Sequence, residues 1–134
     1  MTTLRVYDCE SRALTVDLID MLRLFAPHSL QTNWIVSPVK SLESGREWFE
    51  ATGEGGEQLE LLAEDNVRLS GTELAALAEI TVQVIWGEFT GTKLTQPDEA
   101  WVVVRAIDST FYEVVTDDET VLNKIKSTYN DVRV

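Results

Sequence analysis

The residues that could carry out chemistry are few, and they are scattered along the chain. The one histidine, His28, follows Pro27 in a predicted turn, and the one cysteine, Cys9, lies between two acidic residues. A histidine can act as a general base near neutral pH, but His28 is expected to be an exposed turn residue. A cysteine attacks only as the thiolate, which neighbouring carboxylates disfavour. Cys9 is therefore not expected to be a nucleophile.

Three polar residues stand on or beside predicted strands. Asp108 and Ser109 lie in a short turn between two strands, and a Ser–His–Asp site would require His28 to reach Ser109. The same two side chains suit a turn, where Asp and Ser bind nearby backbone N–H groups. Glu88 lies in an otherwise apolar strand, so it is either solvated or partly buried. A buried carboxylate would be a candidate functional group.

The chain lacks the sequence patterns of phosphate and metal sites. Gly53, Gly55 and Gly56 are close together, but no strand ends before them and no Lys–Ser or Lys–Thr pair follows. There is no cluster of cysteine and histidine with metal-ligand spacing. We therefore predict no catalytic, cofactor-binding or metal site, and we expect a protein that is not an enzyme.

The segment from about Lys40 to Asp65 is strongly acidic. Between Ser41 and Asp65, eight acidic residues accompany one basic residue, Arg46. The segment also holds an aromatic pair, which is either a recognition patch, because aromatic residues dominate binding hot spots, or an anchor to the domain. The candidate partner-binding residues are Glu47, Trp48, Phe49, Glu50, Glu54 and Glu57.

Composition narrows the class of protein. The 134 residues are 44% hydrophobic and 25% charged, which is typical of a single globular domain spanning residues 1–134. Lys and Arg number 11 against 23 Asp and Glu, so the formal charge is −12. This charge disfavours nucleic acid as a partner and favours a basic protein, although it also serves solubility alone. No apolar run is long enough to cross a membrane. The single cysteine and the lack of a secretory signal favour the cytoplasm.

Three β-rich runs in the C-terminal half are expected to form the centre of the fold. Short connections between them favour an antiparallel meander. Both faces of the first two runs carry apolar residues, so we expect both faces to be covered. In this interpretation Val84 and Trp86 share one face of their strand, and Trp101 and Val103 share one face of the next. The three runs are Val82–Phe89, Ala100–Ile107 and Phe111–Val115.

Helical patterns predict about three helices. The first has Thr15 as its N-cap and a stripe at helical spacing. Two capping-box patterns, Ser70–Glu73 and Thr116–Glu119, predict the others. The second helix is expected over Gly71–Ile80. The apolar stripe of the first helix comprises Leu14, Leu18, Met21, Leu22 and Phe25, and that of the third comprises Val121, Leu122, Ile125 and Tyr129.

The remaining elements are short. Arg46–Glu50 is interpreted as a helical turn, Glu57–Asp65 as a short helix or strand, and the structure of residues 40–69 is left open. Together these elements predict an α+β domain with a mainly antiparallel sheet, containing the C-terminal three-strand meander, packed by about three helices. Further strands are expected at Thr3–Asp8, Asn33–Ser37 and the terminal Asp131–Val134.

The meander resembles a known group of proteins. Gln83–Phe89, Trp101–Val104 and Ile107–Tyr112, followed by Thr116–Asp118, resemble segments of small uncharacterised bacterial proteins, some of which are similar to immunity proteins of bacterial toxin systems. The resemblance covers roughly the C-terminal half. It implies a small cytoplasmic α+β protein that binds and blocks a partner toxin. An acidic inhibitor would be attracted to the basic cleft of a toxin that attacks nucleic acid.

Three hypotheses for the function follow. The first is a non-enzymatic acidic protein-binding module, an immunity protein that neutralises a basic toxin domain. The second is a small ligand-binding protein or enzyme with a pocket between sheet and helices, involving Glu88, Asp108 or Ser109. The third is a homo-oligomeric structural protein in which a free sheet edge, or the terminal strand Val132–Val134, pairs with a second copy. None of them requires a cofactor, a nucleic acid or a membrane.

Overall fold

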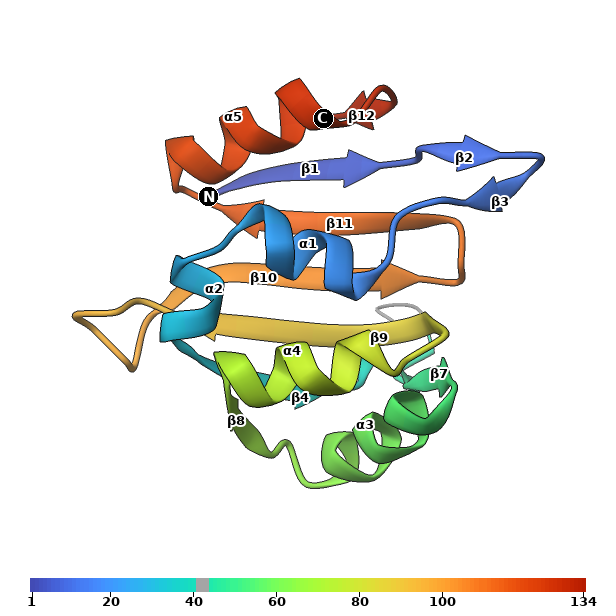
Figure 1. The fold of residues 1–134 in the computed structure, drawn as a ribbon, viewed down its shortest axis with the longest axis vertical. Helices are drawn as coiled ribbons and strands as arrows, with labels where there is room; N and C mark the ends of the chain where they lie inside the picture. Colours follow the sequence, from blue (N-terminus) through green and yellow to red (C-terminus); the bar gives the residue numbers. More distant parts are fainter. Residues whose placement is uncertain (41–43) are drawn as a thin grey trace.

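Eight antiparallel strands form the main sheet of the computed structural model, which describes residues 1–40 and 44–134 (Figure 1). In the order in which they lie side by side, seven of them are β12 (Val132–Arg133), β1 (Thr2–Val6), β11 (Phe111–Thr116), β10 (Ala100–Ile107), β9 (Gln83–Thr92), β4 (Asn33–Ser37) and β8 (Arg68–Ser70). The eighth, β7 (Glu50–Thr52), pairs with the first part of β9. The predicted meander is thus the middle of a larger sheet.

Two short hairpins and five helices complete the described part of the chain. One hairpin pairs β2 (Cys9–Glu10) with β3 (Ala13–Leu14), and the other pairs β5 (Val39–Lys40) with β6 (Glu47–Trp48). The α+β class and the mainly antiparallel sheet are confirmed, whereas the expected three helices are too few. The helices are α1 (Leu18–Leu24), α2 (His28–Gln31), α3 (Glu54–Glu64), α4 (Gly71–Glu79) and α5 (Glu119–Thr128).

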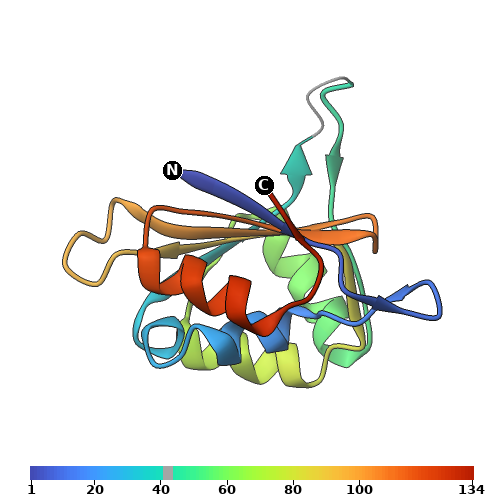
Figure 2. The ribbon, with the colours of Figure 1, turned by 90° about the horizontal axis from the view of Figure 1, so that it is seen from above.

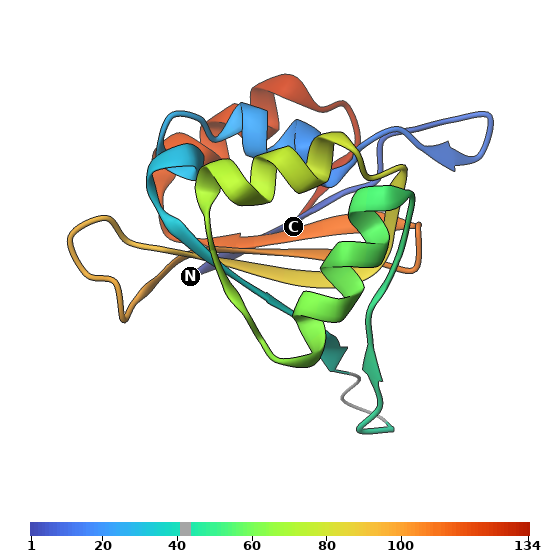
Figure 3. The same cartoon turned by 60° about the horizontal axis from the view of Figure 1, so that its bottom comes forward.

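The helices lie on one side of the sheet (Figures 2 and 3), and the core lies between the two layers. Trp34, Phe89 and Tyr112 from the sheet are completely buried there, as are Met21 and Leu59 from the helices. Burial of each such side chain contributes roughly 1.5–3 kcal/mol to folding. No helix in the described ranges is long and apolar enough to cross a membrane.

In the described part of the chain, no helix lies on the opposite face of the sheet, so the expectation of two covered faces is wrong. Of the described elements, β5 and β6 project from that side (Figure 2). Two local irregularities move two of the apolar residues that suggested double burial, Val84 and Trp101, to the core side of the sheet. Glu50 pairs with Trp86 but Ala51 pairs with Val84, which leaves an extra residue in β9 and sends Val84 into the core while Trp86 stays on the open side.

A second register shift, between Ala100 and Val102, affects the start of β10. It places Trp101 in the core, where its ring makes T-shaped contacts with the rings of Phe25 and Trp34, with 6.1 Å between ring centres in each. Strict alternation predicted that Trp101 and Val103 share one face of the strand, and this prediction is wrong because of the register shift.

Of the three predicted helix caps, one is correct. The capping box of α4 is confirmed, because Ser70 Oγ accepts from the backbone N–H of Glu73 and Glu73 Oε1 accepts from that of Ser70, both at 3.1 Å. The cap of α5 is Asp118 rather than Thr116, since Thr116 still belongs to β11 and donates its hydroxyl hydrogen to Trp101 O at 2.7 Å. The terminal strand is confirmed, because Val132 and Arg133 pair with β1.

The first helix begins later than expected. Leu14 pairs with Cys9 in the β2–β3 hairpin, so it lies outside α1, and the N-cap is Asp17 rather than Thr15. The backbone N–H of Asp17 donates to the carboxylate of Asp20 at 2.9 Å.

The acidic segment contains two strands and a helix. The helical turn expected at Arg46–Glu50 is wrong, because β6 and β7 occupy these residues and β7 completes the edge of β9. Gly55 and Gly56 lie within α3 rather than interrupting it. Position 55 requires glycine because a Cβ there would strike the backbone oxygen of Leu77 in α4. Glu43, one of the acids of this segment, lies outside the described residues.

Candidate functional site

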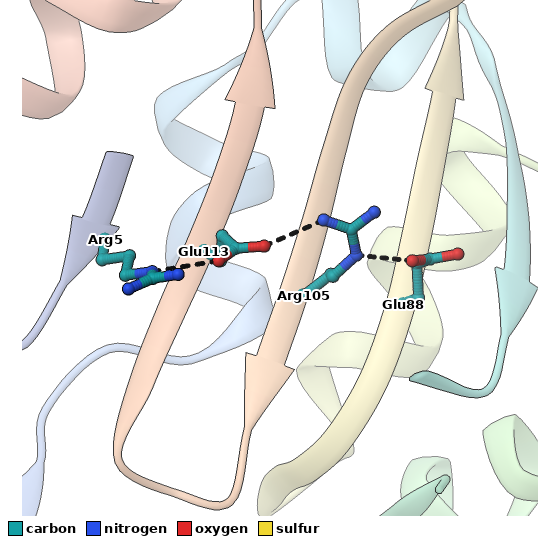
Figure 4. A network of polar contacts seen from close by, with 4 residues as sticks. All are labelled: Arg5, Glu88, Arg105 and Glu113. Atoms are coloured by element: carbon teal, nitrogen blue, oxygen red, sulfur yellow. Dashed lines mark hydrogen bonds and ion pairs between the residues drawn. The ribbon is translucent and has the colours of Figure 1, made fainter. Parts of the chain in front are cut away.

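A row of alternating charges crosses the open face of the sheet (Figure 4). Register places the residues of this charged ladder directly opposite one another on adjacent strands, so their side chains share one face. Three ion pairs join them, at 3.0 Å from Arg5 to Glu113, 2.9 Å from Glu113 to Arg105 and 2.6 Å from Arg105 to Glu88. In order across β1, β11, β10 and β9, the charged ladder is Arg5, Glu113, Arg105 and Glu88.

Each charged side chain of the ladder forms an ion pair with a neighbour in the ladder. Partial burial by itself lowers the pKa of Arg105, but the hydrogen bonds and negative charges of Glu88 and Glu113 raise it above its ordinary value. Glu88 also accepts a hydrogen bond from Ser37 Oγ at 3.2 Å, so each of its oxygens has a partner. Its side chain is 25% exposed. Glu88 is therefore a paired carboxylate in this structure rather than a free acid or base.

An open pocket of about 430 Å³ lies between the ladder and the β5 strand. Pro38, Val39 and Lys40 form its wall, and Glu88 and Arg105 are among the residues of its floor. The second hypothesis expected a pocket between sheet and helices. This pocket lies on the other face of the sheet, and neither Asp108 nor Ser109 lines it.

Asp108 and Ser109 form the tight turn between β10 and β11. Their φ angles are 50° and 57°, so both central positions of the turn are left-handed, and the backbone N–H of Thr110 closes the turn by donating to Ile107 O at 2.9 Å. The N–H of Ser109 donates to Ile85 O at 3.2 Å, and the hydroxyl of Thr110 donates to Asp108 O at 3.1 Å. The turn is confirmed, but the hydrogen bonds at it come from backbone N–H groups and the Thr110 hydroxyl rather than from the expected Asp108 and Ser109 side chains.

His28 is part of an aromatic cluster, so the expectation of an exposed turn residue is wrong. Its ring lies 3.5 Å from that of Trp101 with 7° between the planes, and its Nε2 atom is buried with no hydrogen-bond partner in the described part of the chain. Trp101 begins β10 and Ser109 follows its end, roughly 25 Å away at the usual rise of a strand. A Ser–His–Asp site is therefore not assembled.

Of the six candidate partner-binding residues, one is packed against the domain and five are exposed. Phe49 packs against Phe89 at 6.0 Å and lies against Gly87, so it anchors the segment to the domain. Trp48 remains 39% exposed and stacks on Trp86 at 5.7 Å, with 25° between the rings. The other four, Glu47, Glu50, Glu54 and Glu57, are exposed.

None of these four acids forms an ion pair with another residue of ranges 1–40 and 44–134. Glu60, in the same segment, differs from them, because its carboxylate accepts a hydrogen bond from the backbone N–H of Ala51 at 3.0 Å. The free carboxylates and the exposed indole thus follow one another along β6, β7 and the first turn of α3.

The charged ladder was not predicted from the sequence, although a signal for it exists. The three-residue connection Asp108–Thr110 sets the register of the hairpin, so that Ile107 faces Phe111 and, two residues back, Arg105 faces Glu113. The contributions of Arg5 and Glu88 depend on strand order, which the local sequence does not specify.

Among the described residues, no three His, Cys, Asp or Glu side chains are grouped so that they could hold a metal ion. No protein-family model, no curated protein and no solved structure matches the chain. The assignment of function therefore depends on the surface itself.

Proposed function

We propose that the protein is a non-enzymatic binding module that recognises a basic protein through the acidic strip formed by Glu47, Trp48, Glu50, Glu54 and Glu57. Following the resemblance of the C-terminal half, we propose an immunity-type inhibitor that binds a basic toxin domain. The observation that carries the proposal is the combination of four unpaired, exposed carboxylates with one exposed, stacked indole.

The electrostatics of the strip support a basic partner. Carboxylates that have no intramolecular partner keep their full attraction for an incoming cation, unlike those of the charged ladder. Together with the formal charge of −12, they would accelerate encounter with a basic surface, by about ten-fold to a thousand-fold at low salt. The same negative charge would repel the phosphates of a nucleic acid, so we propose a protein as the partner.

The indole supports a specific contact within this field. Trp48 offers a large amphipathic surface, and stacking on Trp86 limits the freedom that it would lose on binding. Tryptophan is enriched among the few residues that dominate binding energy, and charged residues around it give orientation and rate. Phe49 holds the backbone beneath it in place.

The neighbouring reading frames provide the partner for the test. If one of them encodes a toxin domain, association of an inactive form of that domain is measured by stopped flow at several ionic strengths. Charge reversal of Glu47, Glu50, Glu54 and Glu57 to Lys is expected to slow association at least about ten-fold and to flatten its salt dependence.

A matched variant controls for net charge. Glu10, Glu64, Asp65 and Asp98 are also exposed, and reversing them to Lys changes the charge by the same amount. If both variants associate equally fast, the acidic strip is not the interface. If no neighbouring frame encodes a toxin domain, the immunity form of the proposal fails.

A further inference from the structure

The open face of the sheet has the layered pattern of a surface that packs against another sheet. On one side of the charged ladder lies a row that includes Val115 and Val103, which are directly paired across β11 and β10. On the other side lies a row that includes Phe111 and Ile107, also directly paired. All four are half-buried although no helix covers them. A charged row thus runs between two apolar rows.

The order of charges along the ladder is self-complementary. Read from β1 to β9 it is positive, negative, positive, negative. When a second copy of this row is rotated by 180° and laid against the first, each positive side chain faces a negative one. From this symmetry we propose that the open face binds a second copy of this chain, about a two-fold axis that runs parallel to the strands between β10 and β11.

The two-fold axis fixes which residues meet. Arg5 of each copy faces Glu88 of the other, and Glu113 faces Arg105. Arg5 is suited to this contact, because its side chain is 49% exposed and the pocket of about 430 Å³ has Glu88 on its floor. The arginine of the second copy would enter that pocket.

The apolar rows match under the same rotation. Val115 faces Val103 of the second copy, and Phe111 faces its Ile107, so no apolar row meets a charged one. An axis parallel to the strands also keeps the strands of the two sheets nearly aligned, as in aligned sheet packing, where the angle is about 30° and the layers are about 10 Å apart.

The charge balance explains why this face, rather than another, would join two acidic chains. The ladder holds two positive and two negative side chains and is therefore neutral, whereas the chain as a whole carries a formal −12. Contact through the neutral face keeps most of the like charges apart. Four strands and three rows of residues cover roughly 20 Å by 20 Å, and the projecting β5 and β6 would enlarge the contact.

Edge pairing, the arrangement expected in the third hypothesis, is less suitable. The outermost strands of the sheet are β12 on one side, with two residues, and β7 and β8 on the other, with three residues each. Edges this short offer few backbone groups to a neighbour and are a common protection against edge association. The proposed face-to-face contact does not depend on the acidic strip or on its partner.

Sedimentation equilibrium at physiological salt tests the proposal. We expect the wild-type chain to form dimers and Arg5→Glu to raise the dissociation constant at least about ten-fold, because two like-charge contacts replace two ion pairs. Arg23→Glu is the matched control, since Arg23 is also exposed and also forms one ion pair, with Glu79 at 3.1 Å on the helix side. A wild-type monomer, or equal effects of the two substitutions, would overturn the proposal.

A reversed ladder gives a second readout that does not depend on a loss of binding. The variant Arg5→Glu, Glu88→Arg, Arg105→Glu, Glu113→Arg keeps every intramolecular ion pair with its sign exchanged. It is expected to dimerise with itself but not with the wild type, as measured by energy transfer between labelled chains, with circular dichroism as the check on folding. Free mixing of the two forms would contradict the proposed face.

Discussion

The imidazole of His28 lies flat on the indole of Trp101, with 3.5 Å between the ring centres. The contact excludes water from one face of the imidazole and joins α2 to the start of β10. Trp101 Nε1 also donates a hydrogen bond to Asp118, the N-cap of α5, at 2.8 Å, so that three elements meet at this one tryptophan.

This stack predicts a histidine that is harder to protonate than usual. Burial lowers the pKa of His28 below its ordinary 6.5, while the Thr92 carbonyl and the charge of Asp118 raise it. Since the fold prefers the neutral ring, the contribution of His28 to stability is present above pH 6.5 and is lost as the pH falls through that value. NMR titration should give a pKa below 6.5, and Asp118→Asn should lower it further. A value above 6.5 would mean that Asp118 outweighs burial.

Asp17 should destabilise the fold at neutral pH. Burial, assisted by the charge of Asp20, raises the pKa of Asp17 from 3.8 to about 6. The fold therefore prefers the protonated acid, and this contribution to stability is present below pH 3.8 and is lost as the pH rises to 6. Asn keeps the N-cap without the charge. After allowance for solvent screening of a half-buried group, Asp17→Asn should stabilise the protein by about 1–2 kcal/mol at pH 7.

Urea unfolding between pH 3.5 and 8 measures this effect. The difference in unfolding free energy between Asp17→Asn and wild type should shrink toward zero below pH 4. Asp98→Asn, in an exposed loop, removes the same charge and serves as the control. A stabilisation that does not change with pH would point to the cap rather than to the charge.

The two adjacent aromatic residues of the acidic segment should behave oppositely. Phe49 packs on Phe89 and Gly87, so Phe49→Ala should cost about 2–3 kcal/mol of unfolding free energy through the lost packing. Trp48→Ala should cost less than about 1 kcal/mol, because the indole is more exposed, yet it should weaken partner binding. Equal losses of stability would show that both residues are anchors.

Arg105 should be the most sensitive member of the charged ladder. Arg105→Met leaves Glu88 and Glu113 partly buried without their shared cation, at a cost of about 1–3 kcal/mol. Arg5→Met, at the exposed end of the ladder, should cost less than about 1 kcal/mol. Denaturant unfolding of both variants compares them, and adding Glu88→Gln to Arg105→Met should recover part of the loss.

Among the features that depend on a few consecutive residues, the sequence predicted the cap of α4 correctly but misplaced the caps of α1 and α5. The capping box at Ser70–Glu73 involves only atoms within one helical turn, and it appears as expected. The helical turn expected at Arg46–Glu50 was wrong, because pairing with β9 decides the conformation of that segment. The local sequence of Arg46–Glu50 does not indicate that this segment pairs with β9.

The candidate site was harder to predict than the strands that carry it. Strand alternation assigns a face to each residue only while the register is unbroken, and the shifts in β9 and at Trp101 reverse that assignment. The charged ladder also requires β1 to lie beside β11, a pairing of residues more than a hundred positions apart. The acidic strip, by contrast, is contiguous in sequence, and its exposed acids could be proposed directly.

The position of β1 has a consequence for how the chain acquires its fold. Both neighbours of this first strand, β11 and β12, come from the C-terminal end. During synthesis, the segment Thr2–Val6 must therefore wait for more than a hundred further residues before it finds either neighbour. Such distant pairing slows folding and leaves hydrophobic surface uncovered in the meantime. The nascent chain should thus depend on β11 and β12 to shield Thr2–Val6, and disruption of β12 should reduce yield in cells more than it reduces equilibrium stability.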